Sequence, residues 1–402
     1  MAGNKRKTQN VKRKAKKSKP RKGKKLVAKK VAKKVIKRKK SPKKKLKKPV
    51  KKAILQKFKG NPIIGPVHGS YWESAAAFNP AAIVLDDRVH LFYRALGPDG
   101  ISRIGYASSR DGIHFDQRCI YPVFAAENVQ DARRHHPYTS PARLVYDTTM
   151  FASGGGWGGC EDPRAVEIEG RVYLTFNMFN GWDSMRVAFT SIDKRDILNC
   201  RWNWSKFAYL SRSGDRQKNW VLFPEKFGGK FALLHNIDKG DPARVHIAYL
   251  NNLDISQTPS QSEAPDIHTL PDHLVAWHNR TRSASAPPIK TKDGWLLFYH
   301  AMDKNDPGRY KVGALLLDLN DPSKVLYRST SPLLEPNEWY ENDWKPGIVY
   351  ANGAVVKDGT LFIYYGGGDK HIGVAHTRLD TFLTHLKNNE HIVLSLDPAP
   401  IK

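Results

Sequence analysis

Two adjacent carboxylates and an arginine stand together in the stretch Gly-Cys-Glu-Asp-Pro-Arg at residues 159–164. A carboxyl group whose proton affinity is set by neighbouring groups can act as a general acid, and a nearby cation can hold an anionic reactant. We therefore interpret Asp162, beside Glu161 and Arg164, as the centre of an enzyme site. Two plainer interpretations stay open here. An Asp-Pro step can simply form a turn, and Arg164 can be a structural partner of either carboxylate.

These residues begin the second of five similar segments, each with an apolar strand, a turn containing Gly or Asp, and a second apolar or aromatic strand. The segments are 78–95, 160–178, 222–236, 286–301 and 351–367, and a further strand-like stretch follows each. Alternation with a period of two predicts strands rather than helices. The turn residues recur every ~60 to 80 residues, which suits four-stranded blades; they are Asp87, Gly170, Gly229, Gly294 and Gly359. We predict an all-β fold, a five-bladed β-propeller over residues 61–402. A β-sandwich or a set of unrelated hairpins is the alternative.

Equivalent positions in the five segments are expected to meet in space. In a propeller the first strand of each blade lies innermost, so residues at its start face one central funnel. Asn79 lies eight residues before the turn residue Asp87, and Asp162 lies eight residues before Gly170. We expect six polar side chains beside the prolines of these segments to converge: Asn79, Glu161, Asp162, Arg164, Glu225 and Lys226.

The net positive charge of the chain is confined to its N-terminal segment. The sequence contains 67 Lys and Arg against 38 Asp and Glu, and residues 1–60 hold 30 of the basic residues and no acidic one. Residues 61–402 are therefore close to neutral. A lysine-rich segment of this kind cannot bury enough apolar surface to fold. We predict a disordered tail over residues 1–60, and an intact, active body after removal of residues 1–55.

The composition also bounds the partners and the compartment. A polycationic tail binds polyanions by counterion release, so nucleic acid without sequence preference, an anionic membrane face or an acidic glycan could be its partner. A tail that only solubilises or targets the protein is the plainer interpretation. The three cysteines lie singly, which suits a reducing compartment, and no apolar run reaches the roughly 18 to 20 residues that span a bilayer. We expect a soluble cytoplasmic protein, and a homo-oligomer stays open.

Six motifs, in the same order along the chain, resemble glycoside hydrolase family 130, the mannoside phosphorylases and β-mannosidases built on five-bladed β-propellers. The motifs are FNPAA with a following YRA, DGISRIGYASSRDGIHF, EDPR, LFPEK, GWLLFYHA followed by GALLLDLNDPSKV, and GAVVKDGTLFIYYGGGD. The resemblance covers most of residues 61–385. It implies an enzyme that cleaves a β-mannosidic bond by inverting phosphorolysis and releases mannose 1-phosphate.

The resemblance also implies roles for single residues. Asp162 corresponds to the proton donor, which reaches the departing oxygen through a sugar hydroxyl. Three residues match phosphate-binding positions: Arg94 of YRA, Lys226 of LFPEK and His300 of FYHA. Asn79 and Asp369 match positions that hold the bound mannose, and Glu161 and Arg164 complete the expected substrate-binding set. Inorganic phosphate is the co-substrate, no cofactor is expected, and the partner is a mannose-containing oligosaccharide.

Departures from the family pattern leave other functions open. Residues 281–288 read TRSASAPP and residues 346–354 read PGIVYANGA, where the family commonly has KIGAGPP and PNVVFPCGA. A hydrolytic β-mannosidase is one alternative, because Glu161 or Glu225 could supply the carboxylate base that hydrolysis needs opposite Asp162. A glycan-binding propeller without activity, delivered to polyanions by its tail, is another. No motif has metal-ligand spacing, so no metal is expected.

Overall fold

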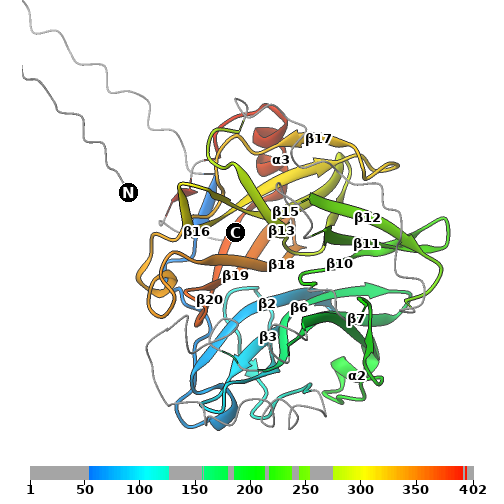
Figure 1. The fold of residues 1–402 in the computed structure, drawn as a ribbon, viewed down its shortest axis with the longest axis vertical. Helices are drawn as coiled ribbons and strands as arrows, with labels where there is room; N and C mark the ends of the chain where they lie inside the picture. The colour runs from blue at the N-terminus through cyan, green and yellow to red at the C-terminus, as the bar shows by residue number, and fades with distance from the viewer. Residues whose placement is uncertain are drawn as a thin grey trace, which may run out of the picture. The chain divides into compact units, whose positions relative to one another are not determined.

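The computed structural model describes residues 54–125, 156, 158–179, 185–212, 217–237, 244–253, 275–392 and 394–395 (Figure 1). The predictions of disorder and of polyanion binding for the N-terminal tail fall mostly on residues 1–53, outside the described residues. Strands make up most of the described part, so the all-β prediction is confirmed. The helical elements are short: α2 (Lys194–Leu198), α3 (Leu379–Lys387) and the 3-10 turns η1 (Tyr71–Glu73) and η4 (Trp339–Glu341). No described helix has the length and apolar character to cross a membrane.

The strands form five successive antiparallel groups, which follow one another from blue to red in Figure 1. A parallel strand pairing joins the first two groups into one eight-stranded sheet, and each of the other groups belongs to a sheet of its own. The first two groups are β2 (Ala76–Leu85), β3 (Arg88–Leu96), β4 (Ile101–Ser109) and β5 (Gln117–Arg118), then β6 (Gly158–Ile168), β7 (Arg171–Phe179), β8 (Met185–Asp193) and β9 (Ala208–Tyr209). The third is β10 (Val221–Phe227), β11 (Lys230–Ile237) and β12 (Arg244–Leu250). The fourth is β13 (Arg280–Ala284), β14 (Ile289–Thr291), β15 (Gly294–Asp303), β16 (Asp306–Leu317) and β17 (Val325–Arg328). The fifth is β18 (Val349–Lys357), β19 (Thr360–Gly367) and β20 (His371–Arg378).

Each predicted strand-turn-strand segment is an antiparallel hairpin. The hairpins are β2–β3, β6–β7, β10–β11, β14–β15 and β18–β19. Tight hairpin turns need residues with positive φ, which Gly adopts freely and Asp tolerates. All five predicted turn residues have positive φ: Asp87, Gly170, Gly229, Gly294 and Gly359. Local sequence chemistry therefore sets the hairpins that carry the candidate site.

Five clusters of buried apolar side chains pack each strand group against the next. Four of them join the first group to the second, the second to the third, the third to the fourth, and the fourth to the fifth. The remaining cluster packs the fifth group against the first, where Phe362 and Tyr364 meet Ala82 and Leu91. The first strands β2, β6, β10 and β18, with Ile289 of β14, also line one cavity of about 430 Å³.

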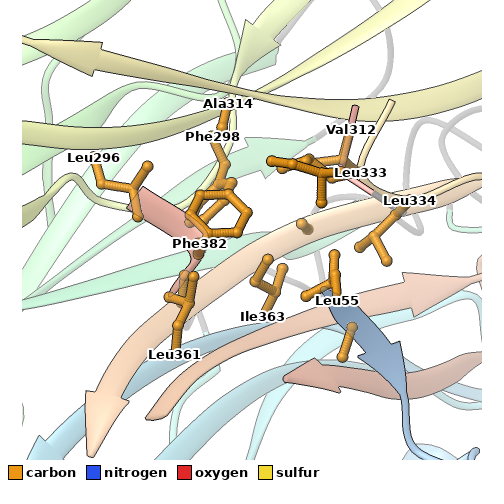
Figure 2. Close-up of a cluster of buried hydrophobic side chains, with 14 of the residues drawn as sticks. Leu55, Leu296, Phe298, Val312, Ala314, Leu333, Leu334, Leu361, Ile363 and Phe382 are labelled. Atoms are coloured by element: carbon orange, nitrogen blue, oxygen red, sulfur yellow. The ribbon is translucent and has the colours of Figure 1, made fainter. Parts of the chain in front are cut away.

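A short strand from the N-terminal segment completes the last sheet. β1 (Leu55–Lys57) pairs with β20, and also with β21 (Leu394–Ser395). Leu55 is fully buried in the cluster drawn in Figure 2. The amine of Lys57 lies 2.6 Å from a carboxylate oxygen of Glu341, and both side chains are buried. The folded body thus begins inside the segment that we assigned to the tail, because the apolar residues Ile54 and Leu55, next to the lysines, are buried in the core.

Candidate active site

Irregularities in β2 and β6 direct two polar side chains toward each other. Each strand carries a bulge at the same place relative to its turn, between Phe78 and Ala81 in β2 and between Glu161 and Arg164 in β6. The bulged residues Asn79 and Asp162 have φ of 46° and 49°, a region that Asn and Asp tolerate better than other side chains. As a result, Nδ2 of Asn79 donates to Oδ1 of Asp162 over 2.7 Å, and the predicted convergence of these two residues is observed.

The Asp162 carboxylate is buried among hydrogen-bond donors. Asn79 and Arg94 donate to Oδ1, the latter over 3.4 Å, and Nδ2 of Asn177 lies 3.4 Å from Oδ2. Burial raises the pKa of Asp162, but the charges of Arg94 and Lys218 and the hydrogen bond from Asn79 lower it below its usual value. The protein without ligand therefore holds Asp162 as a carboxylate.

Two cations meet the carboxylate of Glu161. Arg94 of β3 donates from Nη2 to Oε1 over 2.9 Å, and Nζ of Lys218 lies 3.2 Å from Oε2. Arg94 is also held by Oγ of Ser102, 2.9 Å from its Nε. Burial lowers the pKa of Arg94, but Glu161 and Asp162 raise it above its usual value, so the guanidinium stays charged. The two cations and the two carboxylates form one buried charge cluster.

Lys226 lies outside this cluster. Its amine pairs with Oε2 of Glu169 over 2.7 Å, and Glu169 belongs to the β6–β7 turn, beyond the end of β6 that is remote from Asp162. Lys226 sits only three residues before the turn residue Gly229, so its strand carries it toward the turns. The structure brings Lys218 to the cluster instead.

Arg164 supports the backbone of the bulge. Its Nη1 donates to the main-chain oxygen of Asp162 over 2.7 Å, and its Nε donates to the main-chain oxygen of Ser285 over 3.0 Å. Its Nη2 donates to Oδ1 of Asn219 over 3.1 Å. Asn219 in turn accepts from Nδ2 of Asn177 over 3.3 Å. Arg164 therefore links the second strand group, next to Asp162, to residues of the third and fourth groups through these hydrogen bonds.

His300 belongs to a polar stack beside this network. Its ring lies against the ring of Tyr350 with a centroid separation of 3.7 Å, and Oγ of Ser283 lies 3.0 Å from His300 Nδ1 and 3.1 Å from the Tyr350 hydroxyl. Nδ2 of Asn219 donates to the same hydroxyl over 2.9 Å. Burial and the charge of Arg164 hold the pKa of His300 well below its usual value, so the imidazole is neutral near pH 7.

Asp369 lies on the Arg94 side of the cluster. It follows β19 with a φ of 54°, and its Oδ2 lies 3.1 Å from Nζ of Lys345. Its charge is close enough to raise the pKa of Arg94. Of the nine residues expected at the site, Asp162 and six others lie together, whereas Glu225 and Lys226 form ion pairs with Lys290 and Glu169 elsewhere. Within the described ranges, no group of three or more His, Cys, Asp or Glu side chains could hold a metal ion.

Comparison with known proteins identifies the family. Residues 151–388 match the model of glycoside hydrolase family 130, described as β-1,4-mannooligosaccharide phosphorylase. The chain is 34% identical over 331 residues to a 1,2-β-oligomannan phosphorylase of Thermoanaerobacter sp. (strain X514), spanning 80% of this chain and 96% of that protein. It is 32% identical over 335 residues to a β-1,2-mannobiose phosphorylase of the same organism, spanning 80% of this chain and 96% of that protein.

Solved structures share the fold. The β-1,2-mannobiose phosphorylase of Listeria innocua, solved with β-1,2-mannobiose, superposes with a TM-score of 0.60 at 22% identity and covers 83% of this chain and 99% of its own. A second solved structure superposes with a TM-score of 0.60 at 24% identity and covers 81% of this chain and 93% of its own. Its title states that this family of mannoside phosphorylases contains glycoside hydrolases that target β-1,2-mannosidic linkages in Candida mannan. The chain belongs to glycoside hydrolase family 130.

Proposed function

We propose that the protein cleaves β-mannosidic bonds by inverting phosphorolysis, with Asp162 as the proton donor. One observation carries the proposal: the buried Asp162 lies beside two cations, Arg94 and Lys218, that meet at the carboxylate of the neighbouring Glu161. Cleavage of a glycoside needs a proton for the departing oxygen and a nucleophile at C1. A phosphate nucleophile needs a cationic cradle, and this pair supplies one.

The reaction follows from this arrangement. An oxygen of phosphate forms a bond to C1 of the mannosyl unit while the bond from C1 to the glycosidic oxygen breaks. The proton of Asp162 passes to the departing sugar, directly or through a sugar hydroxyl, and the products are α-mannose 1-phosphate and a sugar shortened by one unit. Phosphate between Arg94 and Lys218 offsets their positive charge, which raises the pKa of Asp162 and favours its protonation before the bond breaks.

The other predicted residues then take supporting roles. Asn79 and Asp369 hold hydroxyls of the mannosyl unit. Asn79 is hydrogen-bonded to the proposed proton donor Asp162, and Asp369 lies near Arg94, so both lie beside the proposed reaction centre. Neutral His300, stacked on Tyr350, forms a wall of the site that donates or accepts single hydrogen bonds. Arg164 keeps the Asp162 backbone in its bulge.

Hydrolysis by the same site is less well supported by the carboxylates. Glu225, one of the two candidate bases, is paired with Nζ of Lys290 over 2.7 and 2.9 Å in an exposed position. Glu161, the other candidate, already accepts from Arg94 and Lys218. A base must be free to take a proton from water, so we favour phosphate as the acceptor.

We propose further that the five strand groups are the blades of a five-bladed β-propeller. Five apolar clusters join successive groups, including the fifth to the first. Strands from all five groups line one cavity. In this arrangement the charge cluster lies at one end of the central funnel and the hairpin turns lie at the other.

The lysines provide a matched pair of variants. Lys218→Ala should raise the KM for phosphate by about tenfold or more, because one cation of the cradle is lost. Lys226→Ala should leave that KM unchanged, since Lys226 pairs with Glu169 away from the cluster. Initial rates of mannoside cleavage at varied phosphate check both, and the reverse order of effects would place the cradle at Lys226.

The proposed reaction is tested by its need for phosphate. Purified protein is incubated with β-1,2- and β-1,4-linked mannobiose, with and without phosphate, and the released sugars are quantified. We expect mannose 1-phosphate to form only with phosphate, and almost no free mannose without it. Equal release of free mannose in both conditions would show that water is the acceptor and that the hydrolase alternative holds.

A further inference from the structure

The carboxylate of Glu161 is fully buried and forms ion pairs with both cations of the proposed phosphate cradle, Arg94 and Lys218. One oxygen lies 2.9 Å from Nη2 of Arg94, and the other lies 3.2 Å from Nζ of Lys218. Arg94 is itself buried, with 2% of its side chain exposed. A buried guanidinium needs a counter-ion at all times, and Glu161 provides one when no phosphate is bound.

We propose that Glu161 is an internal counter-anion that competes with phosphate for Arg94 and Lys218, and so sets how tightly phosphate and the phosphorylated product bind. This inference rests on the proposed function, and it makes Glu161 a positioning residue rather than a base or a sugar ligand. A phosphate between the two cations lies within a few ångströms of the carboxylate, so the two anions repel each other. Arg94 keeps its place through Ser102 and Asp162 when its bond to Glu161 weakens.

Weaker anion binding has a use in this reaction. The same two cations hold phosphate at the start and mannose 1-phosphate at the end, and product release limits the turnover of many enzymes. Without the charge of Glu161, the other carboxylates would offset less of the positive charge of Arg94 and Lys218, and these cations would retain the product. The counter-anion keeps the cations charged and in place, and it keeps their hold on the product reversible.

The test is Glu161→Gln, which keeps the size of the side chain and removes its charge. We expect the KM for phosphate and the inhibition constant of mannose 1-phosphate to fall roughly tenfold together, because the anion no longer meets a like charge. The KM for the mannoside should stay within about twofold. A purely structural ion pair would not move the phosphate constants selectively, so unchanged or higher values overturn the inference.

Two further variants keep the test decisive. Glu225→Gln removes a carboxylate from the exposed pair with Lys290 and should leave every constant unchanged. If Glu161→Gln does not fold, Glu161→Asp provides the test, because the shorter side chain keeps the negative charge but moves it away from Arg94 and Lys218. Its phosphate KM should then fall by a smaller factor, and a rise or no change overturns the inference. Cleavage by the unaltered protein that does not depend on phosphate would instead refute the proposed function itself.

Discussion

Asp162→Asn should reduce the turnover of β-linked mannobiose by about 10²- to 10⁴-fold, the usual contribution of a general acid. An amide cannot donate a proton to the departing oxygen in this way. The substituted side chain keeps an oxygen that can accept from Nδ2 of Asn79, so the fold should persist. The measurement is kcat at saturating phosphate, with circular dichroism to verify folding.

A substrate with an activated leaving group separates loss of the acid from general damage to the site. The leaving group of a dinitrophenyl β-mannoside departs as a stable phenolate and needs no proton. Asp162→Asn should therefore cleave this compound nearly as fast as the unaltered protein, provided phosphate is present. A folded variant that cleaves both substrates at the original rate would show that Asp162 is not the proton donor.

Lys57→Met should lower the free energy of unfolding by about 3–5 kcal/mol, because it leaves the buried Glu341 carboxylate without its cation. The two charged groups lie 2.6 Å apart with 1% and 0% of their side chains exposed. The Lys57 amine also donates to the main-chain oxygen of Glu335 over 2.8 Å. Lys57 lies in β1, so the same change loosens the strand that completes the last sheet. Urea unfolding of the full chain measures the loss.

The control for this prediction is an ion pair at the surface. Lys290→Met breaks the exposed pair with Glu225 and should cost no more than about 1 kcal/mol. The double change Lys57→Met with Glu341→Gln should recover part of the lost stability, since no unpaired charge stays buried. A loss for Lys57→Met as small as that for Lys290→Met would show that β1 contributes little to folding.

The hairpins could be predicted because their signals are local. Alternating apolar residues and a turn residue with positive φ occur within about 20 residues of each other, and all five turns were found at the predicted positions. Counting back from the turns also predicted the meeting of Asn79 and Asp162. The prediction that Glu225 and Lys226 converge with them was wrong, because these two residues stand only four and three residues before Gly229 and pair with Lys290 and Glu169 instead.

The closing strand could not be predicted because its partners are remote in sequence. β1 pairs with β20, where Gln56 lies opposite His376, and it contacts Glu341, which lies 284 residues after Lys57. In the sequence alone, Lys57 looks like one more lysine of the charged tail, because nothing nearby in the sequence indicates its ion pair with Glu341. For this reason a deletion of residues 1–55 would remove Leu55 from the core, and a cut after residue 50 matches the structure better.

Tyr350 and Lys218 were missed in the site for a similar reason. Tyr350 could equally pack between strands, and only contacts from other groups, through Asn219 and Ser283, place it beside His300. Lys218 precedes its strand without a motif. Its role depends on the Glu161 carboxylate that reaches it from β6.

Cleavage of the methyl glycoside of β-linked mannobiose, in oxygen-18 water with phosphate, tests the central claim most directly, because its blocked reducing end gives no free mannose on phosphorolysis. Mass spectrometry of the products reports which nucleophile attacked C1. Attack by phosphate, placed by Arg94 and Lys218 opposite the Asp162 proton, predicts mannose 1-phosphate without label from water and no labelled free mannose. Free mannose that carries oxygen-18 as the main product would contradict phosphorolysis and assign the site to hydrolysis.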